Sequence, residues 1–398
     1  MSEDFDFYSD EFQSDPGQTF ARMIDKCPIH HSDQWGWYSV FRHSDIQQIV
    51  NDNETYSARW GPGPAYSPPE ASILLVSADP PEHTDQKRAV ARAFNLKTMQ
   101  ALEPGLREFV GELLNDLVGK GRCDLITDIG IPVPLWIICE LLGVDFETHV
   151  ARFRDWVEIL AGNVFAQNDP SVAQLAATKV RELQDFFAPK VDEKMARVAA
   201  GEDPGNDILS ELAKVDIDGY RLPRHELMSF AQFLVIAGSG TTTNTIGNFF
   251  RLMLDFPDQY RLLREKPELI ESAVEEVLRY DAPVHGLFRT NNVPVHLGDL
   301  DVPADAKICL MWGAANRDPE VFDNPQVFDI SRNPEQLKQI MSFGGGIHRC
   351  MGAPLARMEV RVVAEEFIRH FPDFREAGAR VPYPFATLNG LDHLQLEW

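Results

Sequence analysis

Residues 343–352 read FGGGIHRCMG, with three glycines in succession at 344–346 and a cysteine at Cys350. Consecutive glycines allow backbone shapes that side chains forbid, and they let the chain approach a flat ligand closely. A strong helical pattern follows from Ala353 to Phe367, so Cys350 lies just before an expected helix N-terminus. Backbone N–H groups and the helix dipole stabilise a thiolate there. A thiolate held by such donors is suited to be an axial iron ligand.

The whole string resembles the heme-binding signature of the cytochrome P450 family, Phe-Gly-x-Gly-x-His-x-Cys-x-Gly. It continues into Leu355 and Ala356 and then Glu359, where the family also has fixed residue types. The alternative interpretation is a buried structural cysteine after a glycine turn, which the complete match disfavours. The resemblance implies that Cys350 is the axial ligand of heme b, and that Phe343 and Gly344 contact this cofactor.

Two further motifs occur upstream in the order that the resemblance requires. Glu276 and Arg279 stand three residues apart on an expected helix, Ser272–Tyr280, so their side chains can pair on one face. By resemblance, Arg332 in the string FDISR completes a buried Glu–Arg–Arg cluster. The implied role is structural, a charge network that holds the heme-side scaffold.

The resemblance also implies which basic residues bind the heme propionates. These are Arg289, His348 and His83, together with the residue four positions after His83. That residue is Lys87, where the family usually has arginine. Because a lysine offers one point charge rather than a bidentate fork, Arg88 is the substitute candidate for this contact. The alternative for these residues is a solvated helix face.

Apolar residues wrap most of the circumference of an expected helix from about 226 to 254, which indicates burial on nearly all sides. Within it, residues 237–243 read AGSGTTT and resemble the family's oxygen-activating pattern, Ala-Gly-x-Asp/Glu-Thr, which breaks the helix locally. Small residues and hydroxyls suit that distortion. Thr241 matches the threonine that hydrogen-bonds dioxygen and helps to deliver protons, and Thr242 follows it.

The chain departs from the pattern at Gly240, where the family has an acid. Three outcomes follow for proton delivery. Ordered water bound by Ser239, Thr241 and Thr242 replaces the carboxylate, the substrate supplies a hydroxyl, or the enzyme couples poorly and releases peroxide. We favour the first, because glycine leaves room for water and hydroxyls can bind it. For Thr243, ordinary filling of the helix is the preferred interpretation.

The expected substrate-contacting residues are apolar or nearly so. Residues on one face of the buried helix share the spacing i, i+3, i+4, although packing within that helix is a comparable interpretation for the first of them. Others follow by resemblance from the segment after the Glu–Arg helix and from a C-terminal turn. None is charged, which suggests a terpenoid, norisoprenoid, steroid or aromatic substrate. The set is Phe233, Ile236, Ala237, Val284, Leu287, Thr387 and Leu388.

Composition excludes several other classes of protein. Hydrophobic residues make up 44% and charged residues 25%, which disfavours disorder, collagen-like repeats and coiled coil. The formal net charge of −24 argues against nucleic acid and anionic membranes as partners. We expect no secretory signal, no membrane span and, from five scattered cysteines, reduced thiols in the cytoplasm.

The fold is expected to be mainly α with a small β portion. By resemblance it is the cytochrome P450 fold, a triangular prism of helices around a buried heme, in one domain over residues 1–398. Strand-like pieces occur at Trp37–Phe41, Val293–Val302 and Leu391–Trp398. A Gly- and Pro-rich stretch, Arg59–Asp85, is expected to be an irregular loop, and with a region from about 146 to 200 it controls access.

The resemblance is closest to the soluble bacterial members, the camphor-hydroxylase-like class, and it implies a monomeric monooxygenase. Such an enzyme uses O2 and electrons from a separate ferredoxin. Lys87, Arg88, Arg92 and Arg349 are expected to form a basic patch for that acidic partner. A peroxide-driven or rearranging heme-thiolate enzyme is the second interpretation, and a non-catalytic heme sensor is the third. The sequence does not identify the substrate, the oxidised position or the ferredoxin.

Overall fold

The computed structural model describes residues 5–66, 74–165, 170–383 and 388–398. The chain divides into two compact units. Unit 1 comprises residues 1–72, 244–350 and 375–394, and unit 2 comprises residues 73–243, 351–374 and 395–398. The boundary at 243/244 falls inside one long helix, α11 (Arg224–Asp255). The expectation of a single domain stays a prediction, and each unit is described by itself.

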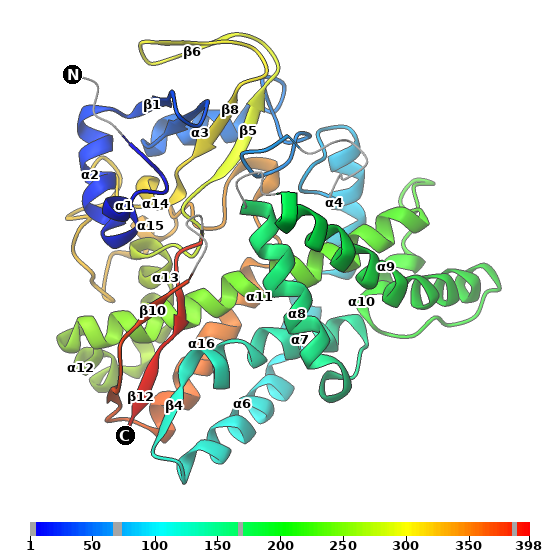
Figure 1. Ribbon diagram of the computed structural model, residues 1–398. Coiled ribbons are helices and arrows are strands. Elements are labelled where there is room, and N and C mark those ends of the chain that lie inside the picture. Colours follow the sequence, from blue (N-terminus) through cyan, green and yellow to red (C-terminus); the bar gives the residue numbers. More distant parts are fainter. Residues whose placement is uncertain (1–4, 67–73, 166–169, 384–387) are drawn as a thin grey trace. The chain divides into compact units, whose positions relative to one another are not determined.

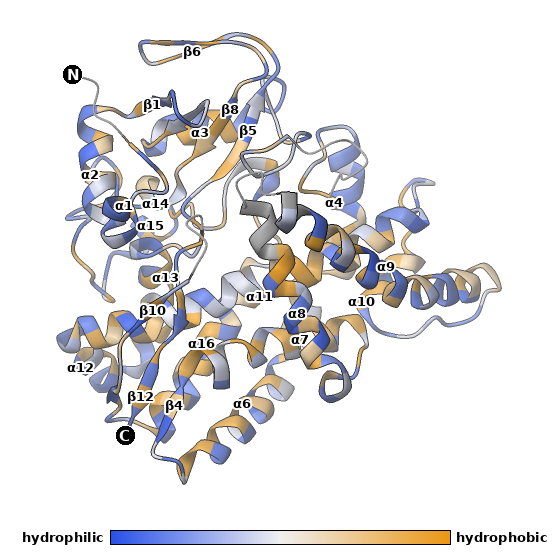
Figure 2. Ribbon diagram, in the orientation of Figure 1, coloured by the Kyte–Doolittle hydropathy of each residue, from blue (hydrophilic) through white to orange (hydrophobic). Residues whose placement is uncertain are grey.

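Unit 1 is built on a five-stranded sheet in the order β1-β2-β8-β5-β3. Figure 1 shows β8 and β5 of this sheet side by side. β2 and β8 are parallel, and the other neighbours are antiparallel. The central strands are rich in apolar residues, and Val40, Ile308 and Leu310 are completely buried; Figure 2 colours β8 as hydrophobic. The strands are β1 (Ile29–Ser32), β2 (Trp37–Val40), β3 (Tyr56–Ser57), β5 (Leu287–Asn291) and β8 (Lys307–Leu310).

Short helices and hairpins complete unit 1. An aromatic cluster of Phe5, Phe7, Phe12 and Phe20 packs the N-terminal helices against the rest of this unit. The helical elements are α1 (Asp10–Ser14), α2 (Pro16–Lys26), α3 (His43–Asn51), α12 (Pro257–Glu265), η3 (Pro267–Leu269), α13 (Ile270–Tyr280), α14 (Trp312–Ala315), α15 (Pro334–Leu337) and η4 (Gly346–His348). The remaining strands are β6 (Val295–Leu297), β7 (Leu300–Val302), β9 (Arg375–Glu376), β10 (Val381–Pro382) and β11 (Leu391–His393).

Unit 2 is mostly helical. Helix α6 packs against α16. Ion pairs link the edges of these two helices, for example Arg107 with Glu365 at 2.6 Å. The helices are α4 (Glu82–Ala93), α5 (Leu96–Gln100), α6 (Glu103–Val118), η2 (Ile126–Gly130, a π-helix), α7 (Pro132–Leu142), α8 (Phe146–Phe165), α9 (Pro170–Ala199), α10 (Ile208–Lys214) and α16 (Ala353–His370). Strand β12 (Gln395–Glu397) pairs antiparallel with β4 (Arg122–Asp124).

The observed elements confirm the predicted mainly α architecture with a small β portion. Two predicted helices differ from their expected limits, since α13 begins two residues earlier and α16 ends three residues later than the pattern alone indicates. Across the described residues, no single helix combines the length and the apolar composition that crossing a bilayer requires. One bent pair, Ile126–Leu142 with Phe146–Leu160, passes that test when taken together, at an angle of 112°.

Candidate functional site

The glycine run at 344–346 forms a tight turn of unit 1 that packs on α3. Gly344 and Gly346 have φ values of +67° and +60°, which L side chains rarely adopt. A Cβ at Gly346 would lie 2.0 Å from the carbonyl oxygen of Val50, and one at Gly345 would lie 2.8 Å from its Cγ2. Glycine is therefore required at these positions. The turn then closes through a hydrogen bond from Cys350 N to Phe343 O at 2.9 Å.

Cys350 at the end of this turn differs from the other four cysteines. It is exposed, whereas Cys123, Cys139 and Cys309 are buried and Cys27 is half-buried. Burial raises the pKa of the Cys123 and Cys139 thiols to about 12, and it raises the pKa of Cys309 further. Burial therefore disfavours the thiolate form of these three residues. Cys350 is the exposed thiol and so the candidate ligand.

The predicted propionate-binding residues are divided between the two units. Arg289 lies on β5 of unit 1, where it is 7% exposed and donates from Nη1 to Phe288 O at 3.0 Å. His348 lies in η4, two residues before Cys350. In unit 2, His83 is buried on α4, and Lys87 lies one turn later, where burial lowers its pKa. Within each unit, one of the two predicted basic residues is buried and the other is half-buried.

A buried lysine that the sequence analysis missed lies next to Arg289 in the sheet of unit 1. Lys307 on β8 is 3% exposed, and its Nζ donates to Trp60 O at 2.9 Å and Gly61 O at 3.3 Å. Burial, and then the charge of Arg289, lower the Lys307 pKa to about 8. This lysine fixes the start of the predicted access loop. A lysine that begins an apolar strand is a weak indication of a buried cation, because most such lysines point to solvent.

The predicted Glu–Arg–Arg cluster is a fully buried network in unit 1. Glu276 accepts from Arg279 Nε at 2.7 Å and Nη2 at 2.8 Å, and from Arg332 Nε at 2.9 Å. The backbone N–H of Asp329 also donates to Glu276, at 2.9 Å. The remaining N–H groups of Arg279 donate to the carbonyl oxygens of residues 316, 325 and 327. The network ties α13 to the segment that leads toward the cysteine turn.

On α11, the expected local break is absent, since the helix is continuous from Arg224 to Asp255. Two threonine hydroxyls instead bond to carbonyl groups one turn earlier. Thr241 Oγ1 donates to Ala237 O at 3.1 Å, and Thr242 Oγ1 contacts Gly238 O at 3.4 Å. The helix remains continuous despite these side-chain hydrogen bonds. Thr243 has a structural contact, because its hydroxyl donates to Gly130 O in η2 at 2.8 Å.

The face of α11 expected to meet substrate is less buried than the rest of the helix. Phe233, Ile236, Ala237, Gly240 and Thr241 are all half-buried, whereas the residues after Thr241 are almost all buried. Their shared spacing places them on one face. This is the face that resemblance assigns to substrate and dioxygen.

The other expected substrate-contacting residues belong to unit 1. Val284 and Leu287 are half-buried among buried neighbours. Val284 forms an isolated antiparallel bridge with Leu388, so these two residues from segments far apart in sequence lie side by side. Thr387 lies outside the described residues.

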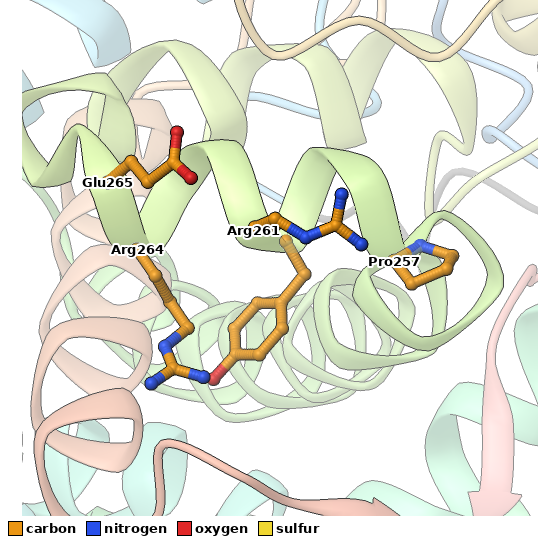
Figure 3. Close-up of a pocket in the computed structure, with 5 residues that line it drawn as sticks. Pro257, Arg261, Arg264 and Glu265 are labelled. Carbon is orange, nitrogen blue, oxygen red and sulfur yellow. The ribbon is translucent and has the colours of Figure 1, made fainter.

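Surface hollows occur away from all of these residues. One of about 450 Å³ on α12 is lined by Pro257, Tyr260, Arg261, Arg264 and Glu265 (Figure 3). A second, of about 720 Å³, lies along α8 and α9, where Arg152 and Lys190 stack on the Phe186 ring. None of the predicted site residues lines either hollow.

Comparison with known proteins places these features in a family. The cytochrome P450 family model matches residues 36–376. The cytochrome P450 monooxygenase PikC of Streptomyces venezuelae is 34% identical over 98% of this chain and 92% of that protein. The erythromycin C-12 hydroxylase of Saccharopolyspora erythraea is 35% identical, over 88% of this chain and 85% of that protein. The crystal structure of CYP109E1 from Bacillus megaterium, in complex with testosterone, has a TM-score of 0.84 at 29% identity and covers 96% of this chain and 99% of that one.

Proposed function

This chain belongs to the cytochrome P450 family and is a heme b oxidoreductase, and we propose that it hydroxylates a small hydrophobic substrate. The oxidant is O2, and the electrons come from a separate ferredoxin and ferredoxin reductase. The observation that supports this most directly is Cys350, an exposed thiol on a glycine turn in a chain whose other cysteines are wholly or partly buried. We further propose that the protein works as a monomer in the cytoplasm.

The residues of unit 1 fit a heme. The glycine turn presents an exposed thiol, and a buried cation at Arg289 suits a carboxylate. Cys350 would supply the thiolate to the iron, and Arg289 and His348 would bind propionates. His83 and Lys87 of unit 2 would do the same, and Phe343 and Gly344 would contact the ring. When bound, the heme supplies activation of O2, and a thiolate ligand favours O–O cleavage, as is general for this family.

Proton delivery in the proposed mechanism depends on the hydroxyls of α11. Thr241 Oγ1 donates to Ala237 O, and a hydroxyl that donates in this way can still accept a hydrogen bond from water. Apart from its chain neighbours and the backbone of its own helix, a Cβ placed at Gly240 would have no atom of the described residues within 4 Å. This space can hold ordered water, and Thr241 would accept a hydrogen bond from that water, so that the water delivers the proton in place of the missing acid.

The substrate is proposed to be apolar and weakly functionalised. The half-buried face of α11 and the bridge between Val284 and Leu388 offer hydrocarbon side chains without a charged group. The names of similar proteins refer to a macrolide and a steroid. A terpenoid, norisoprenoid, steroid or aromatic hydrocarbon would suit such side chains, because burial of apolar surface favours binding.

Two of the four basic residues proposed to bind ferredoxin also contact other residues of unit 2. Arg88 pairs with Asp218 at 2.8 Å, and Arg92 donates to the carbonyl oxygen of Asp216 at 3.3 Å. These contacts within unit 2 engage two of the four basic residues expected in the patch. Lys87 and Arg349 are the remaining candidates for contact with an acidic partner.

One spectral and kinetic experiment tests the proposed function. Testosterone, a monoterpene and an aromatic hydrocarbon are titrated into the heme-loaded protein, and at least one is expected to shift the Soret band toward high spin. Turnover is then compared with NADH plus ferredoxin and its reductase, and with hydrogen peroxide. We expect the ferredoxin system to be faster. Faster turnover with peroxide would favour the second candidate, a peroxide-driven enzyme, which the absent acid at Gly240 supports. Turnover with neither supply would contradict both.

Substitution of Gly240 tests the proposed water-based proton delivery. Gly240→Ala places a methyl group in the space proposed for the ordered water, so it should lower the product formed per NADH. Gly240→Asp fills the same space but supplies a carboxylate as a relay, so it should change that ratio little. General acid–base groups contribute roughly 10²–10⁴-fold to reaction rates. A rise in turnover of that order in Gly240→Asp would show that the native protein lacks an efficient relay, and an unchanged ratio in Gly240→Ala would contradict the proposed water.

A further inference from the structure

The two segments that carry Val284 and Leu388 are joined by a set of asparagine contacts in unit 1. Besides the bridge between Val284 and Leu388, the backbone N–H of Asn389 donates to Pro283 O at 2.9 Å. The Asn389 side chain reaches further along the same segment. Its Nδ2 donates to Ala282 O at 3.2 Å and to the Asp281 carboxylate. One residue therefore contacts three consecutive residues of the facing segment.

A second asparagine connects both segments to α11. Asn248 is 1% exposed, and its Nδ2 donates to Asn389 O at 2.9 Å and to Asp281 O at 3.3 Å. A single amide group thus bonds to both segments at once.

Close packing between α11 and the turn at Gly390 also holds the segment that carries Leu388. Asn244, one turn before Asn248, is completely buried, and a Cβ at Gly390 would lie 2.3 Å from its Oδ1. Neither amide atom of Asn244 has a hydrogen-bond partner among the described residues. Buried polar groups normally have hydrogen-bond partners, so the position of this amide against the turn is unfavourable. Gly390 is therefore the residue that lets the turn lie this close to α11.

A chain of ion pairs fixes Asp281 in turn. Arg251 of α11 pairs with Asp281 and, at 3.1 Å, with Asp255. Arg380 pairs with Asp255 at 2.7 Å. Because these charges are linked, moving Asp281 would disturb several partly buried groups together.

We propose that Asn248, Asp281 and Asn389, hereafter the asparagine clamp, set the spacing between Val284 and Leu388 and so determine which substrate shapes bind. This inference rests on the proposed function in one respect, namely that Val284 and Leu388 contact substrate. The clamp residues are positioning residues, because they act through their neighbours. A clamp of hydrogen bonds keeps two apolar side chains at a fixed separation, which apolar packing alone does not specify.

The test compares Asn389→Ala with a matched control, Asn291→Ala. Asn291 is also in unit 1 and donates from its amide to two carbonyl oxygens, those of Val293 at 2.8 Å and Pro303 at 2.7 Å. Asn291 Oδ1 also accepts from Ala306 N at 2.9 Å, so the control loses three side-chain hydrogen bonds and Asn389→Ala loses two. Spectral dissociation constants are measured in the heme-loaded protein for imidazole and for the bulkier 4-phenylimidazole.

In Asn389→Ala, we expect the dissociation constant of 4-phenylimidazole to change by about tenfold, which corresponds to about 1.4 kcal/mol, while that of imidazole changes by less than about twofold. Neither constant should change in Asn291→Ala. Equal changes for both ligands, or the same change in the control, would overturn the proposal, because a general loss of stability does not discriminate by ligand size.

Hydrogen exchange of backbone amides separates failure of the clamp from failure of the proposed function. Exchange in Asn389→Ala should rise at residues 282–286 and 388–390 together, whatever the ligand or cofactor chemistry. Unchanged exchange would overturn the clamp. Raised exchange without any azole-induced shift of the Soret band in the unsubstituted protein would support the clamp as a structural link and contradict the proposed heme chemistry.

Discussion

Cys350→Ser is expected to reduce oxygenase turnover to background and to remove the thiolate position of the reduced, CO-bound Soret band. The physical reason is that a serine hydroxyl does not ionise at neutral pH and gives the iron no thiolate charge. Cys350→His is expected to keep the heme bound while also losing the thiolate spectrum. Absorbance of the reduced CO complex, with heme content measured in parallel, checks both variants.

The matched control is Cys27→Ser, which changes the half-buried cysteine of the same unit. Its thiol contacts Ile29 O at 3.4 Å and takes no part in the glycine turn. Turnover and the CO spectrum should therefore match those of the unsubstituted protein. Retention of the thiolate spectrum in Cys350→Ser would refute the ligand assignment and with it the proposed function.

Glu276→Gln is expected to lower the free energy of unfolding by about 3–5 kcal/mol, the usual effect of removing one partner from a buried ion pair. Glu276 is completely buried and is the carboxylate that faces both Arg279 and Arg332. A neutral amide would leave two buried guanidinium groups without compensating charge. Urea unfolding of the heme-loaded protein measures this difference through the shift of the midpoint.

Asp258→Asn provides the comparison for an exposed pair of the same geometry. Asp258 and Arg261 are also three residues apart on a helix and lie 3.0 Å from each other, but both side chains are mostly exposed. Exposed pairs contribute about 0–1 kcal/mol, so this variant should unfold almost like the native protein. Similar losses in the two variants would mean that burial does not distinguish the Glu276 network.

Local sequence patterns predicted the parts of the site that depend on local backbone chemistry. The glycine turn before Cys350 follows from residue type alone, because Gly344 and Gly346 adopt positive φ angles. The helices α11 and α16 follow from apolar spacing. Their limits were less accurate, because helix ends depend on the local hydrogen bonds that close them. For α16, Phe371 N donates to Phe367 O at 2.8 Å, which extends the helix to His370.

Contacts between distant segments had no such local signal. Nothing in the sequence around Lys307 indicates that its amine donates to the carbonyl oxygens of Trp60 and Gly61, nearly 250 positions away. The same is true of Asn248 and Asn389, which are polar residues in segments interpreted only for their apolar neighbours. The partners of the predicted basic residues lacked a local signal for a related reason. Asp218 is distant from Arg88 in sequence, and only folding brings the two together.

The sequence by itself determined the family, the mainly α architecture and the candidate iron ligand, because a turn motif and helical periodicity are properties of neighbouring residues. The tertiary structure alone decided which thiols are buried, which cations are desolvated, and how Asn248 and Asn389 hold the Val284–Leu388 bridge. These features arise from packing between segments far apart in the chain. Burial and hydrogen bonding depend on that packing, and residue type at one position does not specify it.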